Sequence, residues 1–156
     1  MKTAIVYRST HHGNTKKVLD AIRDASSDEI VLIDAAEASS VDLNGYDLIG
    51  LASGIYYSKF DKKVLAFART GMPRGKPVFF LYTCGAERDG YTKAIRQALE
   101  GTDANVLGEF GCLGFNTYGP FKLIGGLAKD HPNEADLEDA AAFYRGLHEK
   151  LEGSGG

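Results

Sequence analysis

Residues 2–25 read KTAIVYRSTHHGNTKKVLDAIRDA, and this stretch decides the fold. It opens at 2–7 with a short run of apolar and β-branched residues, which is typical of a strand buried on both faces. At 14–25 the apolar residues recur at intervals of three and four, which predicts an amphipathic helix. A buried strand joined by a short loop to such a helix is the first half of a βαβ unit.

The same alternation continues to the end of the chain. Further apolar runs predict strands at 29–34, 46–53, 76–83 and 105–114, and further amphipathic stretches predict helices at 61–70, 91–100 and 134–151. Strands that alternate with helices form a parallel sheet with helices on both faces. We therefore expect an α/β fold with a doubly wound, five-stranded parallel sheet, in either the half-Rossmann strand order or the order 2-1-3-4-5.

Length and composition narrow the class of protein. A chain of 156 residues forms one domain by default, so we expect a single domain at 1–152 and a flexible tail or a remnant of cloning at 153–156. No run approaches the roughly 18 apolar residues of a membrane span, and the first strand begins too early to leave room for a signal peptide.

Charge and cysteine usage predict where the protein works. Cys84 and Cys112 are spaced neither as metal ligands nor as a disulfide framework, which favours a cytoplasmic protein. A formal net charge of -3 with mixed signs argues against a nucleic-acid-binding protein. We expect a monomer.

Both sheet orders place a ligand at the carboxyl ends of the strands. The loops that follow the first, third, fourth and fifth predicted strands are STHHGNT at 9–15, SGIYYSKF at 53–60, TCGAERDGY at 83–91 and FNTYGPFKLIGGLAKDHP at 115–132. The last loop is too long for an ordinary connection, and its aromatic residues predict a wall or lid of the site. The alternative is an exposed loop at the sheet edge.

The loop at 9–15 combines hydroxyl groups with a row of backbone N–H groups at a predicted helix start, which suits a phosphate. The Walker and dinucleotide-binding glycine patterns are both absent, so a single terminal phosphate is the expected ligand. The alternative is that these side chains only cap the helix.

Tyrosines follow in the next two loops. Tyr56, Tyr57 and Tyr91 offer flat aromatic faces beside the predicted phosphate loop, where a planar ring would stack between them. Ordinary packing is the alternative for each of the three. A phosphate and a planar ring together indicate flavin mononucleotide (FMN).

At this point the sequence resembles the flavodoxin family, over almost the whole chain from Lys2 to about Leu151. YRSTHHGNT is similar to the family's phosphate loop, and YDLIGLASGIYYSKF and TCGAERDGY are similar to its two isoalloxazine loops. The run NVLGEFGCLG has no insertion, as in short-chain members. The flavodoxin-type protoporphyrinogen oxidase shares the S-T-x-x-G-x-T form of the first loop.

The resemblance implies a flavodoxin-like sheet of order 2-1-3-4-5, FMN as the cofactor, no metal and no catalytic side chain. It places the phosphate at Ser9, Thr10, His11, His12, Gly13, Asn14 and Thr15. The ring lies between Ser53, Gly54, Ile55, Tyr56 and Tyr57 on one side and Thr83, Cys84, Gly85 and Tyr91 on the other, with Phe115 and Tyr118 from the long loop at its edge.

The chain departs from the familiar electron carriers of the family in three ways. His11 and His12 stand where those carriers have neutral hydroxyl residues and one position fewer. The chain has no tryptophan, which those carriers often stack on the flavin, and it is nearly neutral where they are strongly acidic. Lys59, Lys62 and Lys63 are expected to make the flavin easier to reduce, unless they only form a solvated helix end.

Two functions follow from this resemblance. The first is an electron-transfer protein that shuttles electrons between a reductase and an acceptor protein. The second is an FMN-dependent oxidoreductase that acts directly on a quinone, a porphyrinogen or another planar small molecule.

Other classes fit the residues poorly. Cys84 and Arg88 have too few residues between them for a cysteine phosphatase. A signalling receiver domain needs an acidic pair after the first strand, where Arg8 and Ser9 stand. His11 and His12 are adjacent and have no ligand cluster beside them, so they make a weak metal site.

Overall fold

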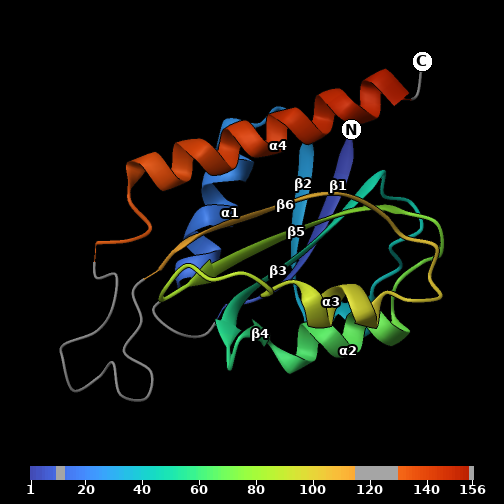
Figure 1. Cartoon of the computed structure of the whole chain (residues 1–156). Coiled ribbons are helices and arrows are strands. Elements are labelled where there is room, and N and C mark those ends of the chain that lie inside the picture. The colour runs from blue at the N-terminus through green and yellow to red at the C-terminus, as the bar shows by residue number, and fades with distance from the viewer. Residues whose placement is uncertain (10–12, 115–129, 155–156) are drawn as a thin grey trace.

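The computed structural model describes residues 1–9, 13–114 and 130–154 of the chain (Figure 1). Its elements in chain order are β1 (Lys2–Arg8), α1 (Asn14–Ala25), β2 (Glu29–Asp34), a 3-10 turn (Ala38–Ser40), β3 (Leu48–Tyr56), β4 (Lys59–Phe60), α2 (Lys62–Thr70), β5 (Pro77–Cys84), α3 (Lys93–Ala98), β6 (Asn105–Leu113) and α4 (Glu134–Ser154).

The sheet has the order β2-β1-β3-β5-β6, and these strands pair in parallel throughout. Because β5 and β6 are the fourth and fifth parallel strands, the expected order 2-1-3-4-5 is confirmed. In Figure 1, α1 and α4 cover one face of the sheet and α2 and α3 cover the other. The fold is therefore doubly wound, as the alternation of strands and helices predicts.

Each central strand sends alternate side chains to two separate cores. Leu51 and Phe80 face α2 and α3 in one core, while Ala52 and Leu81 face α1 and α4 in the other. These four side chains are fully buried. The central strands are therefore apolar on both faces, whereas the outer strands β2 and β6 keep exposed positions.

Several boundaries differ from those that the sequence predicts. β3 continues through Tyr56, so residues 53–56 of the predicted loop at 53–60 lie in this strand, and the chain then turns back as the short strand β4. β4 pairs with β3 in antiparallel fashion. α4 runs to Ser154 and so includes two residues of the predicted tail.

No helix within the described ranges is long and apolar enough to cross a membrane.

Candidate functional site

The carboxyl ends of the central strands lie level with one another. The register of parallel pairing puts Arg8 of β1 opposite Ser53 of β3, and Gly54 of β3 opposite Thr83 of β5. The loops that follow these strands therefore begin at one edge of the sheet. This is the edge at which the sequence predicts a ligand.

The start of α1 lies at this edge and is built to favour an anion. Gly13 precedes the helix in a left-handed conformation, with φ of 65°. The Ser9 hydroxyl oxygen accepts a hydrogen bond of 3.1 Å from the backbone N–H of Lys16 and caps the first turn. No acidic side chain lies in that turn, so nothing there opposes the partial positive charge of the helix end.

Part of the predicted phosphate loop is not described. Thr10, His11 and His12 lie outside the described residues. The same is true of Phe115 and Tyr118, the two predicted site residues of the long loop after β6.

Two buried threonines join α1 to β5. The hydroxyl oxygens of Thr15 and Thr83 lie 2.8 Å apart, and the two residues are 1% and 4% exposed. Two hydroxyl groups carry two hydrogens, and this bond needs only one of them. The pair therefore fixes the helix start against the sheet and keeps a hydroxyl hydrogen for a further bond.

The end of β6 approaches the start of α1 so closely that only glycine fits. A Cβ atom at Gly114 would lie 2.7 Å from the side-chain nitrogen of Asn14. The backbone N–H of Gly114 donates to the carbonyl oxygen of Cys84 at 2.8 Å, which holds it there. Sequence reasoning missed Gly114, although a glycine directly after a predicted strand marks a close backbone approach.

The end of β3 is shaped by Ser53 and Gly54. The Ser53 hydroxyl is fully buried, donates to the carbonyl oxygen of Gly54, and accepts from the backbone N–H of Asp61 at 2.9 Å. A Cβ atom at Gly54 would come within 2.9 Å of the phenolic oxygen of Tyr56. The Tyr56 ring therefore folds back over Gly54, while Ile55 points to the opposite face and packs against the core.

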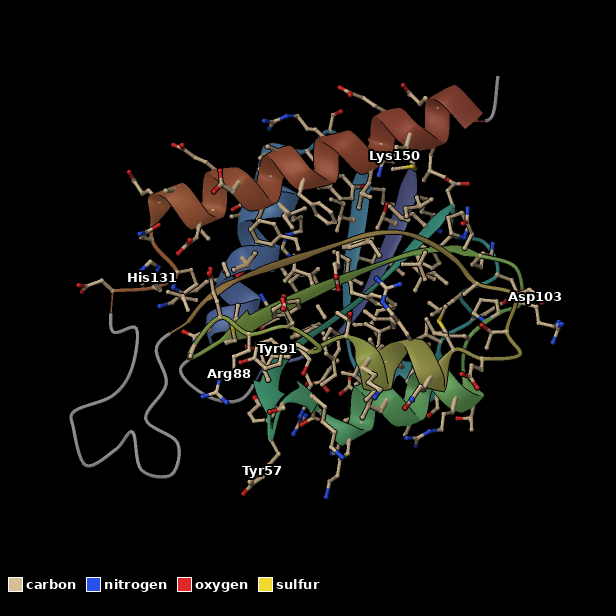
Figure 2. All side chains as sticks on the ribbon, in the orientation of Figure 1. Tyr57, Arg88, Tyr91, Asp103, His131 and Lys150 are labelled. Carbon is tan, nitrogen blue, oxygen red and sulfur yellow. The ribbon has the colours of Figure 1, made fainter. Side chains whose placement is uncertain are left out.

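Tyr56 and Tyr57 lie next to each other at this edge but point in different directions. Tyr57 lies in the turn between β3 and β4, is 79% exposed, and projects away from the molecule in Figure 2. The difference arises because β3 ends at Tyr56 and the chain turns at Tyr57 and Ser58. That both tyrosines line one side of a ring stays a prediction.

Tyr91 is engaged within its own loop. Its ring packs edge to face against Tyr82, with the ring centroids 5.5 Å apart, and its hydroxyl donates to the carbonyl oxygen of Ala86 at 2.6 Å. The residue is 7% exposed. These contacts fix Tyr91 within the loop after β5, and its place beside a flavin ring stays a prediction.

The two cysteines are inert thiols. Burial raises the pKa of Cys84 to about 11 and that of Cys112 to about 12. The Cys84 thiol donates to the carbonyl oxygen of Cys112, with 3.6 Å between the atoms. A thiol with so high a pKa is protonated at neutral pH, which removes the nucleophile that a cysteine phosphatase requires.

A cavity of about 380 Å³ lies beside the loop after β5. Its lining residues are Tyr82, Cys84, Glu87, Arg88, Asp89 and Gly111. Gly111 allows the cavity to form, because a Cβ atom there would lie only 2.2 Å from the ring of Tyr82. The Tyr82 ring therefore lies across β6 and forms one wall.

An ion pair beside the helix start was also missed by sequence reasoning. The Arg8 guanidinium at the end of β1 lies 3.1 Å from the carboxylate of Asp34 at the end of β2. The side chains are 27% and 37% exposed. The pair holds the two strand ends together next to Ser9.

The described residues fit the FMN that the family resemblance implies. The phosphate end is matched by the partial positive charge at the start of α1, the Ser9 hydroxyl and the Thr15–Thr83 pair. The ring end is matched by the Tyr56 phenol over Gly54 and by the uncharged thiol of Cys84. Glycines stand at both close approaches, Gly54 and Gly114, where a larger side chain would intrude.

Comparison with known proteins agrees with this site. Residues 4–115 match the family described as a flavodoxin domain. The chain is 38% identical over 149 residues to an uncharacterized protein of Methanocaldococcus jannaschii, which covers 94% of this chain and 98% of that protein.

Solved structures show the same fold. A flavodoxin from the domain Archaea superimposes with a TM-score of 0.73 at 20% identity, covering 97% of this chain and 99% of that one. The rubredoxin oxygen:oxidoreductase of Desulfovibrio gigas superimposes with a TM-score of 0.69 at 16% identity, covering 97% of this chain but 36% of that one. The family match over residues 4–115 and the relative at 38% identity establish that the chain belongs to the flavodoxin family, whose cofactor is FMN.

Proposed function

We propose that this protein binds FMN without a covalent bond and carries electrons between a reductase and an acceptor protein. The observation that supports this most directly is the joining of the α1 start to the end of β5 by the Thr15–Thr83 hydroxyl pair. That pair connects a place for a phosphate to a place for a flat ring. A bound FMN supplies the acceptance and donation of one or two electrons.

The side chains around the cofactor bind and orient it. The first turn of α1 and the hydroxyls of Ser9 and Thr15 hold the phosphate, because charge-assisted hydrogen bonds favour an anion there. Tyr56 would lie along the ring, and Cys84 would face it as an uncharged thiol. Tyr91 keeps the loop after β5 in place from behind.

A titration with three flavins tests this proposal. We expect FMN to bind more tightly than riboflavin by about 3 kcal/mol, roughly a hundredfold, because riboflavin lacks two or more hydrogen bonds to the charged phosphate. FAD is also expected to bind weakly, since the loop accommodates a terminal phosphate and not a bridging pyrophosphate. Equal affinity for riboflavin would show that no phosphate site exists at α1.

Two variants locate the ring within the same titration. In Gly54→Ala the new Cβ atom displaces the Tyr56 phenol, so FMN affinity is expected to fall while the fold persists. Gly45→Ala is the matched control, because a Cβ atom at Gly45 meets nothing within 4 Å. Unchanged FMN affinity in Gly54→Ala would place the ring away from β3.

The cavity beside the loop after β5 favours a second function, a direct oxidoreductase. Its volume of about 380 Å³ leaves room for a small planar compound beside the aromatic wall formed by Tyr82, while Glu87, Arg88 and Asp89 make the rest of the lining charged. Turnover of such a compound by the FMN-loaded protein, with no partner protein present, would favour this function over the carrier. The cytoplasmic location stays a prediction from the sequence.

A further inference from the structure

The turn between β3 and β4 is held in an unfavourable conformation. Tyr57 and Ser58 have φ angles of 52° and 68°, in the left-handed region that glycine or asparagine usually occupies. Two large hydrophobic residues are exposed within the described ranges: Val41 is 39% exposed and Tyr57 is 79% exposed. Backbone strain of this kind costs local stability and is found often at functional sites.

Three lysines follow in positions that also oppose local stability. Lys59 lies on β4, and Lys62 and Lys63 form the first positions of α2, where the helix carries no acidic residue. Cations at a helix N-terminus are repelled by the partial positive charge of the helix end. These lysines therefore do not stabilise the start of α2 through the helix dipole.

Charges around the three lysines do not neutralise them. All three are exposed, and none of them forms a salt bridge with any described residue. The nearest acid in the chain, Asp61, directs its carboxylate to the backbone N–H of Lys63 as the helix cap. In the neighbouring loop after β5, Arg88 stands between Glu87 and Asp89. The segment 57–63 is therefore positive on a chain whose net charge is -3.

We propose that this segment, which carries the exposed Tyr57 and the exposed Lys59, Lys62 and Lys63, is the docking surface for a redox partner protein whose own surface is acidic. The inference rests on the proposed function, because the surface adjoins the end of β3 where the flavin ring is expected. The strained turn and the lysines at the start of α2 both cost local stability, and they occur together in one short segment. Such a combination is typical of functional sites.

A protein partner suits this surface better than a nucleic acid does. An aromatic anchor within a charged rim is the usual composition of a protein interface. A nucleic-acid surface carries a more extended basic patch, on a domain of positive net charge. An acidic partner also gains a faster encounter with the lysines at low salt.

The first test maps the charge without using the flavin. The isotope-labelled chain is titrated with hexacyanochromate(III), a redox-inert paramagnetic trianion, and the broadening of each backbone amide is recorded by NMR. We expect broadening at 58–63 in addition to broadening at the anion site at the start of α1, and we expect the broadening at 58–63 alone to be lost in the triple variant Lys59→Glu, Lys62→Glu, Lys63→Glu. Arg23→Glu, Arg69→Glu, Arg145→Glu is the matched control: it makes the same change in net charge at exposed positions outside the segment, and it is expected to keep the broadening. Broadening spread evenly over the surface would overturn the proposal.

The second test measures electron transfer from the reduced, FMN-loaded protein to an acidic rubredoxin and to the basic carrier cytochrome c. We expect the rate constant with rubredoxin to fall about tenfold as salt is raised, because attraction is screened. The lysine triple variant is expected to reverse this dependence and to favour cytochrome c.

The aromatic anchor is tested by Tyr57→Asn, because asparagine tolerates the left-handed turn and leaves the charges unchanged. We expect a slower reaction with rubredoxin and unaltered hexacyanochromate mapping.

A wild-type protein that reacts faster with cytochrome c at low salt, or that binds single-stranded DNA more tightly than it binds rubredoxin, would overturn the proposal. If the protein failed to bind FMN, both the proposed function and the role of the segment 57–63 in docking a redox partner would be refuted. The hexacyanochromate titration would still show whether this segment attracts anions.

Discussion

At the scale of single residues, the Thr15–Thr83 pair is the contact on which the site depends. Both side chains are almost wholly buried, and each hydroxyl is the other's partner at 2.8 Å. Sequence reasoning selected both threonines, but as ligands of opposite ends of the cofactor. It had no means of pairing them, because 68 positions separate them and only the folded sheet brings them together.

This pairing has a measurable cost when it is broken. Thr83→Val keeps the shape of the side chain but leaves the buried hydroxyl of Thr15 without its partner, which is expected to lower the free energy of unfolding by about 1–3 kcal/mol. Thr83→Ser keeps the hydroxyl and serves as the control. In urea unfolding of the FMN-free protein, the double variant Thr15→Val, Thr83→Val is expected to cost less than the sum of the two single variants. Strictly additive costs would mean that the two hydroxyls do not interact.

At the scale of elements, sequence periodicity located the helices and the parallel strands well. The bounds of α1 and β2 agree with the predicted ranges 14–25 and 29–34. The short strand β4 was missed, because hairpin turns are recognised by Asn-Gly or Asp-Gly and this turn is formed by Tyr57 and Ser58. The exposed position of Tyr57 follows from the same turn and was missed for the same reason.

Substitutions at the two ends of α2 test whether the lysines at its N-terminus lower the stability of the helix. Lys62→Glu and Lys63→Glu are each expected to raise the free energy of unfolding by about 0.3–1 kcal/mol, because an acidic side chain suits the helix N-terminus. Arg69→Glu, in the last turn of the same helix, is the control and is expected to lower it. Urea unfolding at low ionic strength measures all three. A loss of stability in the lysine variants would show that these cations have local partners after all.

At the scale of the whole molecule, a network at the amino ends of the strands ties the first strand to the last helix. Asp28 has a side chain that is 5% exposed, and its carboxylate accepts hydrogen bonds from Tyr144 of α4 and from the imidazole of His148, each at 2.8 Å. The other imidazole nitrogen of His148 lies 2.7 Å from Glu152. Tyr144 also bonds to Thr3 of β1. The predicted helix at 134–151 includes Tyr144, but its periodicity gave no signal for the polar partners, which lie far apart in the chain.

The network sets how the stability of the fold depends on pH. Only a protonated imidazole donates from both nitrogens, so His148 bridges the two carboxylates as a cation. Its hydrogen bond to Asp28, followed by the bond to Glu152, raises the pKa of His148. Burial raises the pKa of Asp28, but the hydrogen bonds from His148 and Tyr144 outweigh burial, so the pKa of that carboxyl is lowered overall.

The two groups therefore act on opposite sides of neutrality. The contribution of Asp28 is present above its ordinary pKa of about 3.9 and is lost as the pH falls through the lowered folded value. The contribution of His148 is complete below its ordinary pKa of about 6.5 and is lost as the pH rises through the raised folded value. Stability is thus expected to be highest in mildly acidic solution and to decline toward alkaline pH.

His148→Gln is expected to remove the alkaline decline, because glutamine keeps a polar side chain but has no proton to lose in this range. Urea midpoints measured between about pH 6 and pH 9 check this, with the wild type losing stability and the variant staying nearly level. His131→Gln is the matched control, since His131 bonds to Asp136 near the other end of α4, and it is expected to retain the decline. If His148→Gln declined as steeply as the wild type, the proton that stabilises this fold would have to lie on a group other than His148.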